Sequence, residues 1–427
     1  MSVAFARPAG VGNRVVVDGT TATWRDLPEL ALPAAPVAVL VHSARYALAA
    51  ARHHAVHGGE LLLSTPGRVD AMMRDELRDA GFTVAELGAD AVGVDTAGGV
   101  DTGGTAAPAG FRPVERDRLW LLTSGSTGRP KRVGHTLASL TTVRGEQPAR
   151  TWLCPYAPGT YAWWQVVTLS LTQPGQDLVV VEPEQFDDWP ALAAAHGVDA
   201  ASGTPTFWRR ALHRDPVGLA RVPLRQLTLG GEPVDQAILD RLREVFPTAR
   251  ISWIYASSEV GAAVVVHDGR AGFPVEWLDR TTPGRPTLGV RDGELVITSP
   301  YHGAGLDGPI RTGDRAQLVG DRVLISGRLD SDEINVGGSK ISASGVRDVL
   351  TAHPRVAWAR VTGRRAPLLG HMVVAEVVLT AADPATAAPD EAGLVRWCAD
   401  RLPEYAVPRR IRVLTEIPVK ETLKSDV

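Results

Sequence analysis

The stretch that decides the fold is residues 121–133, LLTSGSTGRPKRV in one-letter code. The apolar run Leu119 to Leu122 predicts a buried strand, and six consecutive Ser, Thr or Gly residues follow it at 123–128. Small residues let backbone N–H groups approach an anion closely, and Lys131 adds a compact positive charge. Further donors are the hydroxyls of Thr123, Ser124, Ser126 and Thr127. The stretch predicts a phosphate-binding loop, with a polar surface loop as the alternative. It is not a Walker loop, because arginine follows the lysine.

With its flanks, this loop resembles the signature loop of the adenylate-forming superfamily, which includes acyl-CoA synthetases, nonribosomal-peptide adenylation domains and luciferases. The match to the superfamily pattern Thr-Ser-Gly-Ser/Thr-Thr-Gly-x-Pro-Lys is close. The resemblance implies that the loop holds the phosphates of ATP and that Ser126 also contacts magnesium. The phosphate-binding residues it implies are Thr123, Ser124, Gly125, Ser126, Thr127, Gly128 and Lys131.

The composition is that of a globular protein of two or more domains, with 427 residues, 44% hydrophobic and 22% charged. A net charge of −3 gives no electrostatic case for binding nucleic acid or an anionic membrane. No apolar run approaches the length of a membrane span, and the first twenty residues lack a secretory pattern. The two cysteines, Cys154 and Cys398, predict buried free thiols in a reducing cytoplasm.

Lysine is rare, since only Lys131, Lys340, Lys420 and Lys424 stand among 45 basic residues. Where a chain uses arginine for nearly every positive charge, we expect the few lysines at positions that need a compact, mobile ammonium. The planar guanidinium of arginine cannot replace it there. Chance within an arginine-rich composition is the alternative. The positions of these lysines in the motifs below favour the functional interpretation.

Short apolar runs alternate with helical patterns before the loop, for example Val37 to Val41 and then Arg45 to Val56. This alternation predicts an α/β fold with a largely parallel sheet. The resemblance implies a large N-terminal domain of mixed sheets with flanking helices at residues 1–329. It also implies a small mobile C-terminal α+β domain at residues 331–427, with Asp330 as the hinge.

Two motifs in the middle of the chain resemble nucleotide-binding segments of the superfamily. Gly230-Gly231-Glu232 resembles the turn beside the adenine, and its paired glycines let the chain pass close to a flat ligand. Tyr255-Ala256-Ser257-Ser258-Glu259 resembles the pattern Tyr-Gly-x-Thr-Glu. The resemblance implies that the tyrosine stacks on adenine, the serine hydroxyl at 258 binds the α-phosphate, and the glutamate helps to hold magnesium, a cation that prefers oxygen ligands.

Further motifs follow in the order of the superfamily. Arg311-Thr312-Gly313-Asp314 matches its Arg-Thr-Gly-Asp, which implies that Asp314 accepts the ribose hydroxyls. A turn-forming aspartate is the alternative. The resemblance also implies that Arg328 contacts the nucleotide and that Lys340 belongs to the glycine-rich loop opening the small domain. The glutamate pair usual after that loop is replaced by Ser342-Ala343-Ser344-Gly345.

The last motif concerns the mobile lysine of the superfamily. Aligned through Pro418, that lysine falls on Lys424, with Leu423 in place of the preceding glycine and Lys420 in place of a threonine. Lys420 is therefore a rival candidate. The catalytic residues implied by the resemblance are Lys424, Glu259 and Ser258.

The substrate pocket is implied at the aromatic helix that starts near residue 161. Tyr161, Trp163 and Trp164 would wall the acyl pocket together with Gly203, although the tryptophans could equally be core. Amino-acid-activating members carry an aspartate where Ala162 stands, and no acidic residue occurs between positions 151 and 176. A buried ammonium without a carboxylate is costly. We therefore expect an acid without an α-ammonium.

The resemblance implies that the protein activates a carboxylic acid with ATP and Mg²⁺, giving an acyl-adenylate and pyrophosphate. Transfer to a thiol would follow, either CoA or the phosphopantetheine of an acyl carrier protein. Two alternatives stay open: an enzyme that passes the acyl group to a nitrogen nucleophile, and a non-catalytic binder that kept the fold. Loss of Lys424 or Glu259 would mark the latter, and both are present.

Overall fold

The computed structural model describes residues 8–88, 91–94, 114–123, 130–143, 145–329, 332–366, 370–380, 389–420 and 423–424. The chain forms two compact units. The first unit consists of Met1–Ser202, Ser257–Ala262 and Tyr301–Asp307. The second unit consists of Gly203–Ala256, Ala263–Pro300 and Gly308–Val427. Among the described residues, no helix combines the length and the apolar character that crossing a bilayer requires.

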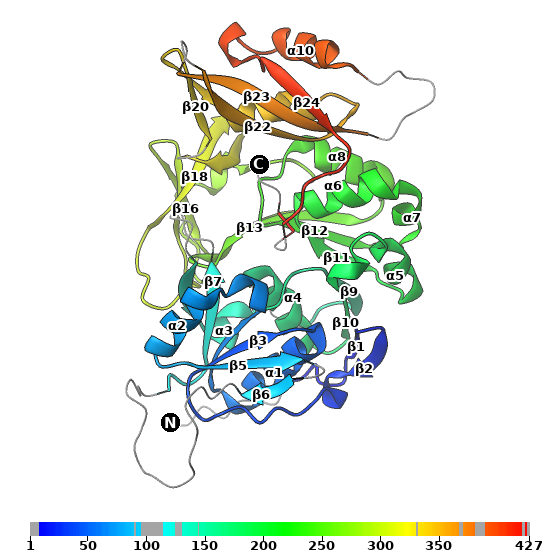
Figure 1. Ribbon diagram of the computed structural model, residues 1–427, viewed down its shortest axis with the longest axis vertical. Helices are drawn as coiled ribbons and strands as arrows, with labels where there is room; N and C mark the ends of the chain where they lie inside the picture. The colour runs from blue at the N-terminus through cyan, green and yellow to red at the C-terminus, as the bar shows by residue number, and fades with distance from the viewer. Residues whose placement is uncertain are drawn as a thin grey trace. The chain divides into compact units, whose positions relative to one another are not determined.

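A six-stranded sheet of order β6-β5-β3-β4-β7-β8 lies in the first unit (Figure 1). Strands β5, β3, β4 and β7 run parallel, and β6 and β8 are antiparallel edges. The bounds are β3 Val37–Val41, β4 Glu60–Ser64, β5 Thr83–Gly88, β6 Ala91–Val94, β7 Arg118–Thr123 and β8 Lys131–His135, with helices α1 Ala44–His57 and α2 Ala71–Asp79. Every residue of β3 and β4 is buried, as expected for parallel strands covered on both faces. The predicted largely parallel sheet is confirmed.

The first unit also contains the strand order β11-β9-β10-β1-β2. The bounds are β1 Arg14–Val17, β2 Thr20–Thr23, β9 Arg150–Cys154, β10 Gln176–Val180 and β11 Ala200–Gly203, with helices α3 Leu137–Leu140, α4 Tyr161–Thr172 and α5 Trp189–Ala195. Strands β1 and β2 form a hairpin through the turn Asp18-Gly19, where Asp18 has a φ of 50°. Asparagine, aspartate and glycine tolerate this conformation, which explains the turn.

The second unit opens with α6 and the strand order β14-β13-β12, followed by an antiparallel sheet of order β15-β19-β18-β17-β16. The bounds are α6 Pro205–Arg214, α7 Pro216–Arg221, β12 Gln226–Gly230, α8 Gln236–Val245, β13 Arg250–Ser257, β14 Gly261–Val266, β15 Phe273–Pro274, β16 Thr287–Arg291, β17 Glu294–Thr298, β18 Ile310–Val319 and β19 Arg322–Arg328. Strands β12 and β13 are parallel. Their carboxyl ends carry the Gly-Gly-Glu and Tyr-Ala-Ser-Ser-Glu motifs.

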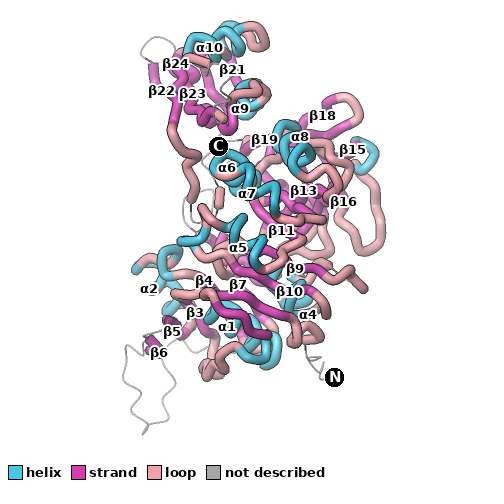
Figure 2. Tube along the Cα trace, turned by 90° about the vertical axis from the view of Figure 1, so that its right-hand side faces the viewer, coloured by secondary structure: helices cyan, strands magenta, loops and turns pink. Residues whose placement is uncertain are grey.

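The C-terminal part of the second unit is an α+β structure (Figure 2). Its bounds are β20 Glu333–Val336, β21 Ser339–Ser342, α9 Ala343–Thr351, β22 Val356–Ala366, β23 Gly370–Leu379, α10 Glu391–Ala399 and β24 Arg410–Leu414. The strand order is β21-β20-β23-β22, and β24 pairs in parallel with β23. Residues of both helices and of this sheet share one hydrophobic core. The predicted α/β fold with a C-terminal α+β part is confirmed. The predicted hinge, Asp330, lies outside the described residues, and the boundary there stays a prediction.

Short 3₁₀ helices complete the chain. They lie at Trp24–Asp26, Pro66–Arg68, Pro183–Gln185, Val275–Trp277 and Glu404–Ala406. Both cysteines, Cys154 and Cys398, are buried and free, as their separation in the sequence predicted.

Candidate nucleotide and acyl site

The predicted phosphate loop connects β7 to β8 in the first unit. Its two ends, Thr123 and Lys131, are cross-strand partners, and the Thr123 hydroxyl donates to the Lys131 carbonyl over 3.5 Å. The remaining predicted residues of the loop, Ser124, Gly125, Ser126, Thr127 and Gly128, lie outside the described residues. Their phosphate-binding role stays a prediction.

The backbone of the Ser258-Glu259 segment is held from two sides within the first unit. His135, at the end of β8, donates from Nε2 to the carbonyl of Ser258 over 2.7 Å. The amide of Gly303 donates to the carbonyl of Glu259 over 3.0 Å. His135 is 2% exposed, and burial lowers its pKa, so the ring is neutral at pH 7. The Ser139 hydroxyl lies 3.0 Å from Nδ1 and donates to the Thr136 carbonyl over 3.0 Å.

Tyr161 lies at the first turn of α4, near the same segment. The capping residue Thr160 accepts from the amide of Trp163 over 3.3 Å and fixes the helix start. The ring centroid of Tyr161 is 5.9 Å from that of His135. Its hydroxyl would lie 3.5 Å from a Cβ placed on Gly261. Burial raises the pKa of Tyr161, which keeps the hydroxyl protonated and able to donate.

Trp163 and Trp164 follow on the same helix and are 0% and 1% exposed. Their rings meet edge to face with centroids 4.9 Å apart, and neither indole N–H has an acceptor among the described residues. This geometry fits tight core packing as well as a pocket wall. Packing alone explains the glycine at position 203, because a Cβ there would stand 2.3 Å from a ring carbon of Phe207.

Three predicted nucleotide residues meet in the second unit: Tyr255 on β13, Asp314 on β18 and Arg328 on β19. The Tyr255 hydroxyl donates to Asp314 over 2.5 Å, and an Arg328 nitrogen lies 3.4 Å from the other carboxylate oxygen. Burial raises the pKa of Asp314, and Tyr255, Arg328 and Lys424 oppose this shift. Burial and the neighbouring carboxylate raise the pKa of Tyr255 well above its ordinary value. The cluster presents a carboxylate beside a guanidinium, an arrangement that can accept hydroxyl donors.

A residue that sequence reasoning missed holds the turn before Asp314. Glu294, on β17, is 5% exposed and accepts from the amide of Gly313 over 2.7 Å. It also accepts from Nε of Arg311 over 2.6 Å. The arginine of the Arg-Thr-Gly-Asp motif therefore pairs with a buried carboxylate, which also holds the backbone of Gly313 beside Asp314. The pairing depends on the register of two strands, which the sequence does not display.

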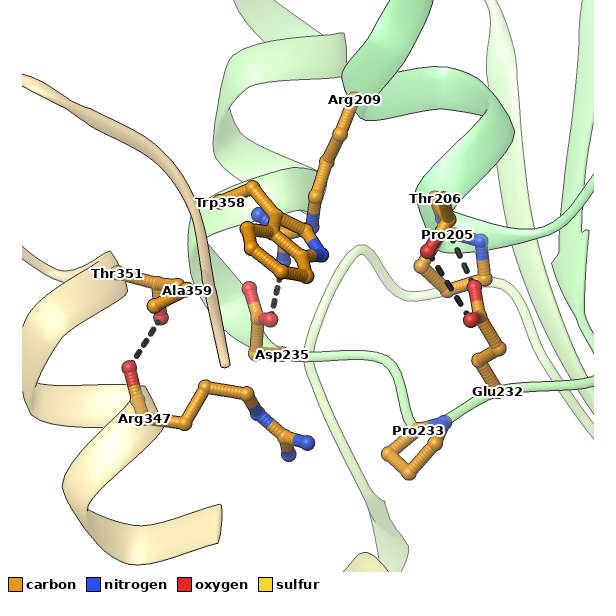
Figure 3. A pocket seen from close by; sticks show the side chains of 10 residues that line it. All are labelled: Pro205, Thr206, Arg209, Glu232, Pro233, Asp235, Arg347, Thr351, Trp358 and Ala359. Carbon is orange, nitrogen blue, oxygen red and sulfur yellow. Dashed lines mark hydrogen bonds and ion pairs between the residues drawn. The ribbon is translucent and has the colours of Figure 1, made fainter. Parts of the chain in front are cut away.

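The Gly230-Gly231-Glu232 turn follows β12. Gly231 has a φ of +83°, a conformation that favours glycine. The carboxylate of Glu232 accepts from the amide and the hydroxyl of Thr206, over 2.9 and 3.0 Å, at the start of α6 (Figure 3). Glu232 thus ties the turn to a helix N-terminus, where a carboxylate is favoured.

A pocket adjoins Glu232 in the second unit (Figure 3). It is lined by Pro205, Thr206, Arg209, Glu232, Pro233, Asp235, Arg347, Thr351, Trp358 and Ala359. Arg209 and Asp235 form an ion pair there. Apart from Glu232, none of the predicted site residues lines this pocket.

Lys424 approaches the Gly-Gly turn. Its Cε and Nζ lie 3.3 and 3.8 Å from the position that a Cβ on Gly231 would take. The turn that carries it closes through the amide of Leu423, 2.8 Å from the Lys420 carbonyl, and the amide of Lys420, 2.9 Å from the Lys424 carbonyl. By contrast, Lys340 is 2.9 Å from Glu333 across the β20–β21 hairpin. The second unit therefore brings Lys424 to Gly231, and the positive charge of Lys424 acts to lower the pKa of Asp314.

Comparison with known proteins decides the family. The model of the AMP-binding enzyme family matches residues 47–301, more than half of the chain, and that of the AMP-binding enzyme C-terminal domain matches residues 346–424. The chain belongs to the AMP-binding enzyme family. The resemblance to adenylate-forming enzymes is confirmed.

One sequence relative of this AMP-binding family member is a 2-succinylbenzoate–CoA ligase from Geobacillus kaustophilus (strain HTA426). It is 31% identical over 230 residues, which are 47% of this chain and 45% of the ligase. The alignment thus spans less than half of the ligase.

Two solved structures show the same fold. The amide bond synthetase McbA from Marinactinospora thermotolerans has a TM-score of 0.69 at 21% identity, covering 98% of this chain and 96% of that chain. An o-succinylbenzoate coenzyme A synthetase from Bacillus subtilis, in complex with ATP and a magnesium ion, has a TM-score of 0.64 at 20% identity. That match covers 96% of this chain and 95% of the synthetase.

In this AMP-binding family member, the predicted residues fall into two groups. Tyr255, Asp314, Arg328 and Lys424 gather in the second unit, whereas Tyr161 lies near the backbone of Ser258 and Glu259 in the first. The histidine at 135 was missed, although its place at the end of the strand after the phosphate loop was a readable signal.

Proposed function

We propose that this chain activates a carboxylic acid with ATP, forming an acyl-adenylate and releasing pyrophosphate. The observation that carries the proposal is Lys424 at Gly231, with its charge acting on the Tyr255–Asp314–Arg328 cluster. Five separate sequence segments supply these residues: the turn after β12, the strands β13, β18 and β19, and the segment after β24. They combine a mobile positive charge with hydrogen-bonding groups suited to ribose and adenine.

The chemistry requires positioning and electrostatic stabilisation. The substrate carboxylate attacks the α-phosphorus, the bond to the pyrophosphate oxygen breaks, and negative charge accumulates on the phosphate oxygens. Lys424 would stabilise the oxygens at the reacting centre, and Lys131 with the loop at 124–128 would hold the departing pyrophosphate. Tyr255 would lie against the adenine, and Asp314 would accept from the ribose hydroxyls, with Ala256, Ser257 and the Ser258 hydroxyl beside the α-phosphate.

Magnesium fits the proposed site through Glu259. A carboxylate is a suitable ligand for this hard cation, and Ser126 is the second predicted one. Within the described part of the chain, no group of three His, Cys, Asp or Glu side chains could hold a metal by itself. The ATP phosphates would therefore supply the remaining oxygens, and the bound ion would neutralise their charge.

The acyl acceptor is proposed to be a thiol, on CoA or on the phosphopantetheine of a carrier protein in the cytoplasm. The ligase relative uses CoA by its name, which supports this choice. A nitrogen acceptor is the second candidate, because one structural neighbour is an amide bond synthetase. In either case, rotation about Asp330 would withdraw Lys424 and admit the acceptor.

The acid is proposed to lack an α-ammonium. The first turn of α4 carries no acidic residue, and the protonated Tyr161 lies there instead. A buried ammonium would have no carboxylate to pair with in this turn.

The test is ATP–pyrophosphate exchange with amino acids and with their deaminated analogues, alongside aryl, aliphatic and dicarboxylic acids. We expect exchange with an acid that has no α-ammonium, followed by product formation when CoA, a carrier protein or an amine is added. Strong exchange with an ordinary α-amino acid alone would refute the substrate assignment. ATP binding without exchange for any acid in the panel would favour the non-catalytic binder.

A further inference from the structure

The turn that presents Lys424 contains a residue in an unfavourable backbone conformation. Leu423 has a φ of +60°, a region that bulky side chains rarely adopt. Its side chain is nonetheless 2% exposed. The superfamily pattern has glycine at this position, whereas this chain has a buried apolar side chain on a backbone conformation that favours glycine. A residue held in this way needs surrounding contacts that enforce its conformation.

Thr204 supplies the polar contact. Its hydroxyl donates to the carbonyl of Leu423 and accepts from the amide of Phe207 over 3.1 Å. The amide is itself a donor, so the single hydroxyl proton is directed to Leu423. Thr204 is 1% exposed, and its methyl carbon lies 3.7 Å from a Cβ placed on Gly231. One side chain therefore caps α6, contacts the Gly-Gly turn and holds the lysine turn.

Another contact between the C-terminal segment and this part of the second unit is weaker. Arg214 and Glu416 are 3.3 Å apart, with side chains 40% and 72% exposed. Exposed pairs of this kind are screened by water and salt and contribute little. The buried hydrogen bond to Leu423 is the interaction suited to fixing the position of Lys424.

We propose that Thr204 is a positioning residue which, with the buried side chain of Leu423, holds Leu423 and Lys424 against the start of α6. This contact places Lys424 at Gly231 for adenylate formation. The proposal rests on the function proposed above for Lys424. It predicts that adenylate formation depends on the Thr204 hydroxyl, whose partners here are the Leu423 carbonyl and the Phe207 amide.

The test compares Thr204→Val with Thr204→Ser. Valine keeps the shape but can neither donate to Leu423 nor cap α6, whereas serine keeps both interactions. We expect the single-turnover rate of adenylate formation to fall roughly 10–100-fold in the valine variant, the order for a displaced catalytic group, with ATP affinity unchanged. The serine variant should retain most of the wild-type rate.

The control separates positioning from loss of a helix cap. Asp70→Ala removes the cap of α2, whose carboxylate accepts from the amide of Met73 over 2.8 Å. It should lower the melting temperature without slowing adenylate formation. A wild-type rate in Thr204→Val would overturn the proposal, as would an equal loss of rate in Asp70→Ala.

Hydrogen exchange gives a readout that does not need activity. The amides of Lys420 and Leu423 are bonded within the turn, so they should exchange faster in Thr204→Val than in wild type and Thr204→Ser. Unchanged exchange would show that Thr204 does not hold the turn. Faster exchange in Thr204→Val, in a protein whose wild type activates no acid, would refute the proposed function. It would still show that Thr204 holds Leu423 in place.

Discussion

At the scale of single residues, the site depends on side chains whose partners are remote in sequence. Lys424 approaches Gly231, and Asp314 accepts from Tyr255. His135 supports the carbonyl of Ser258. In the proposed function, each of these contacts would place a charge or a hydrogen-bonding group beside the nucleotide. Substitutions at these positions should therefore separate binding from catalysis.

Lys424→Ala should reduce adenylate formation by about 10²–10³-fold, the order for removing one preorganised electrostatic contact, and leave ATP binding nearly intact. The physical reason is that the ammonium matters most as charge develops on the reacting oxygens. Pyrophosphate exchange measures the rate, and equilibrium dialysis measures binding. Lys420→Ala is the matched control. Full activity in Lys424→Ala together with loss in Lys420→Ala would identify Lys420 as the catalytic lysine.

We expect His135 to make the free energy of unfolding depend on pH under mildly acidic conditions. Burial lowers its pKa in the folded state, so the unfolded chain binds more protons below the ordinary value near pH 6.5. The free energy of unfolding should fall as the pH drops from 6.5 toward the folded pKa. Urea titrations at pH 7.5 and 5.5 measure this difference, which should be smaller in His135→Gln. An unchanged difference in the variant would contradict the assignment.

At the scale of elements, the start of α9 is fixed by one buried carboxylate. Asp332 is 5% exposed and accepts from the amide of Ser344 over 2.6 Å and from the hydroxyls of Ser342 and Ser344 over 2.7 and 2.9 Å. Arg315, on β18, lies 3.4 Å from the same side chain. These serines stand where the superfamily pattern has its glutamate pair, and here their hydroxyls donate to Asp332.

Asp332→Ala should lower the free energy of unfolding by about 1–3 kcal/mol, because buried donors lose their acceptor. Chemical denaturation followed by tryptophan fluorescence measures the change. Glu244→Ala is the control, since Glu244 lies on α8, is 63% exposed and pairs with Arg241 over 2.9 Å. Such a pair contributes roughly 0–1 kcal/mol. Equal effects from the two substitutions would contradict the role of Asp332.

At the scale of the whole molecule, the predicted nucleotide contacts divide between the two units. The residues predicted to contact the adenosine part of the nucleotide lie in the second unit: Tyr255, Asp314 and Arg328. Lys131 and Glu259, predicted to act at the phosphates and magnesium, lie in the first. AMP should therefore slow hydrogen exchange mainly in second-unit peptides. Mg²⁺ with ATP should add protection at residues 257–259 and in the peptide that spans the phosphate loop.

Asp314→Ala is the control for this experiment, because removing the ribose acceptor should abolish the protection by AMP. Glu259→Ala should leave the protection by AMP unchanged and alter the magnesium dependence of the ATP effect. Identical protection patterns for AMP and for Mg²⁺ with ATP would show that the first-unit motifs do not bind the outer phosphates.

The sequence by itself determined the fold class, the family and the order of the motifs. These follow from local information: small residues after a buried strand, paired glycines, and apolar runs of strand or helix length. A backbone that must approach phosphates or turn sharply restricts the residues at each position, so the motifs can be read without a structure.

Only the tertiary structure decided how the motif side chains are used. Glu232 bonds to Thr206, Arg311 pairs with Glu294, and Leu423 takes a left-handed conformation beneath the hydroxyl of Thr204. These contacts join positions that are up to 219 residues apart. Strand register and helix packing create such neighbours, and the hydrophobic period of one segment does not identify the remote residue that each side chain meets.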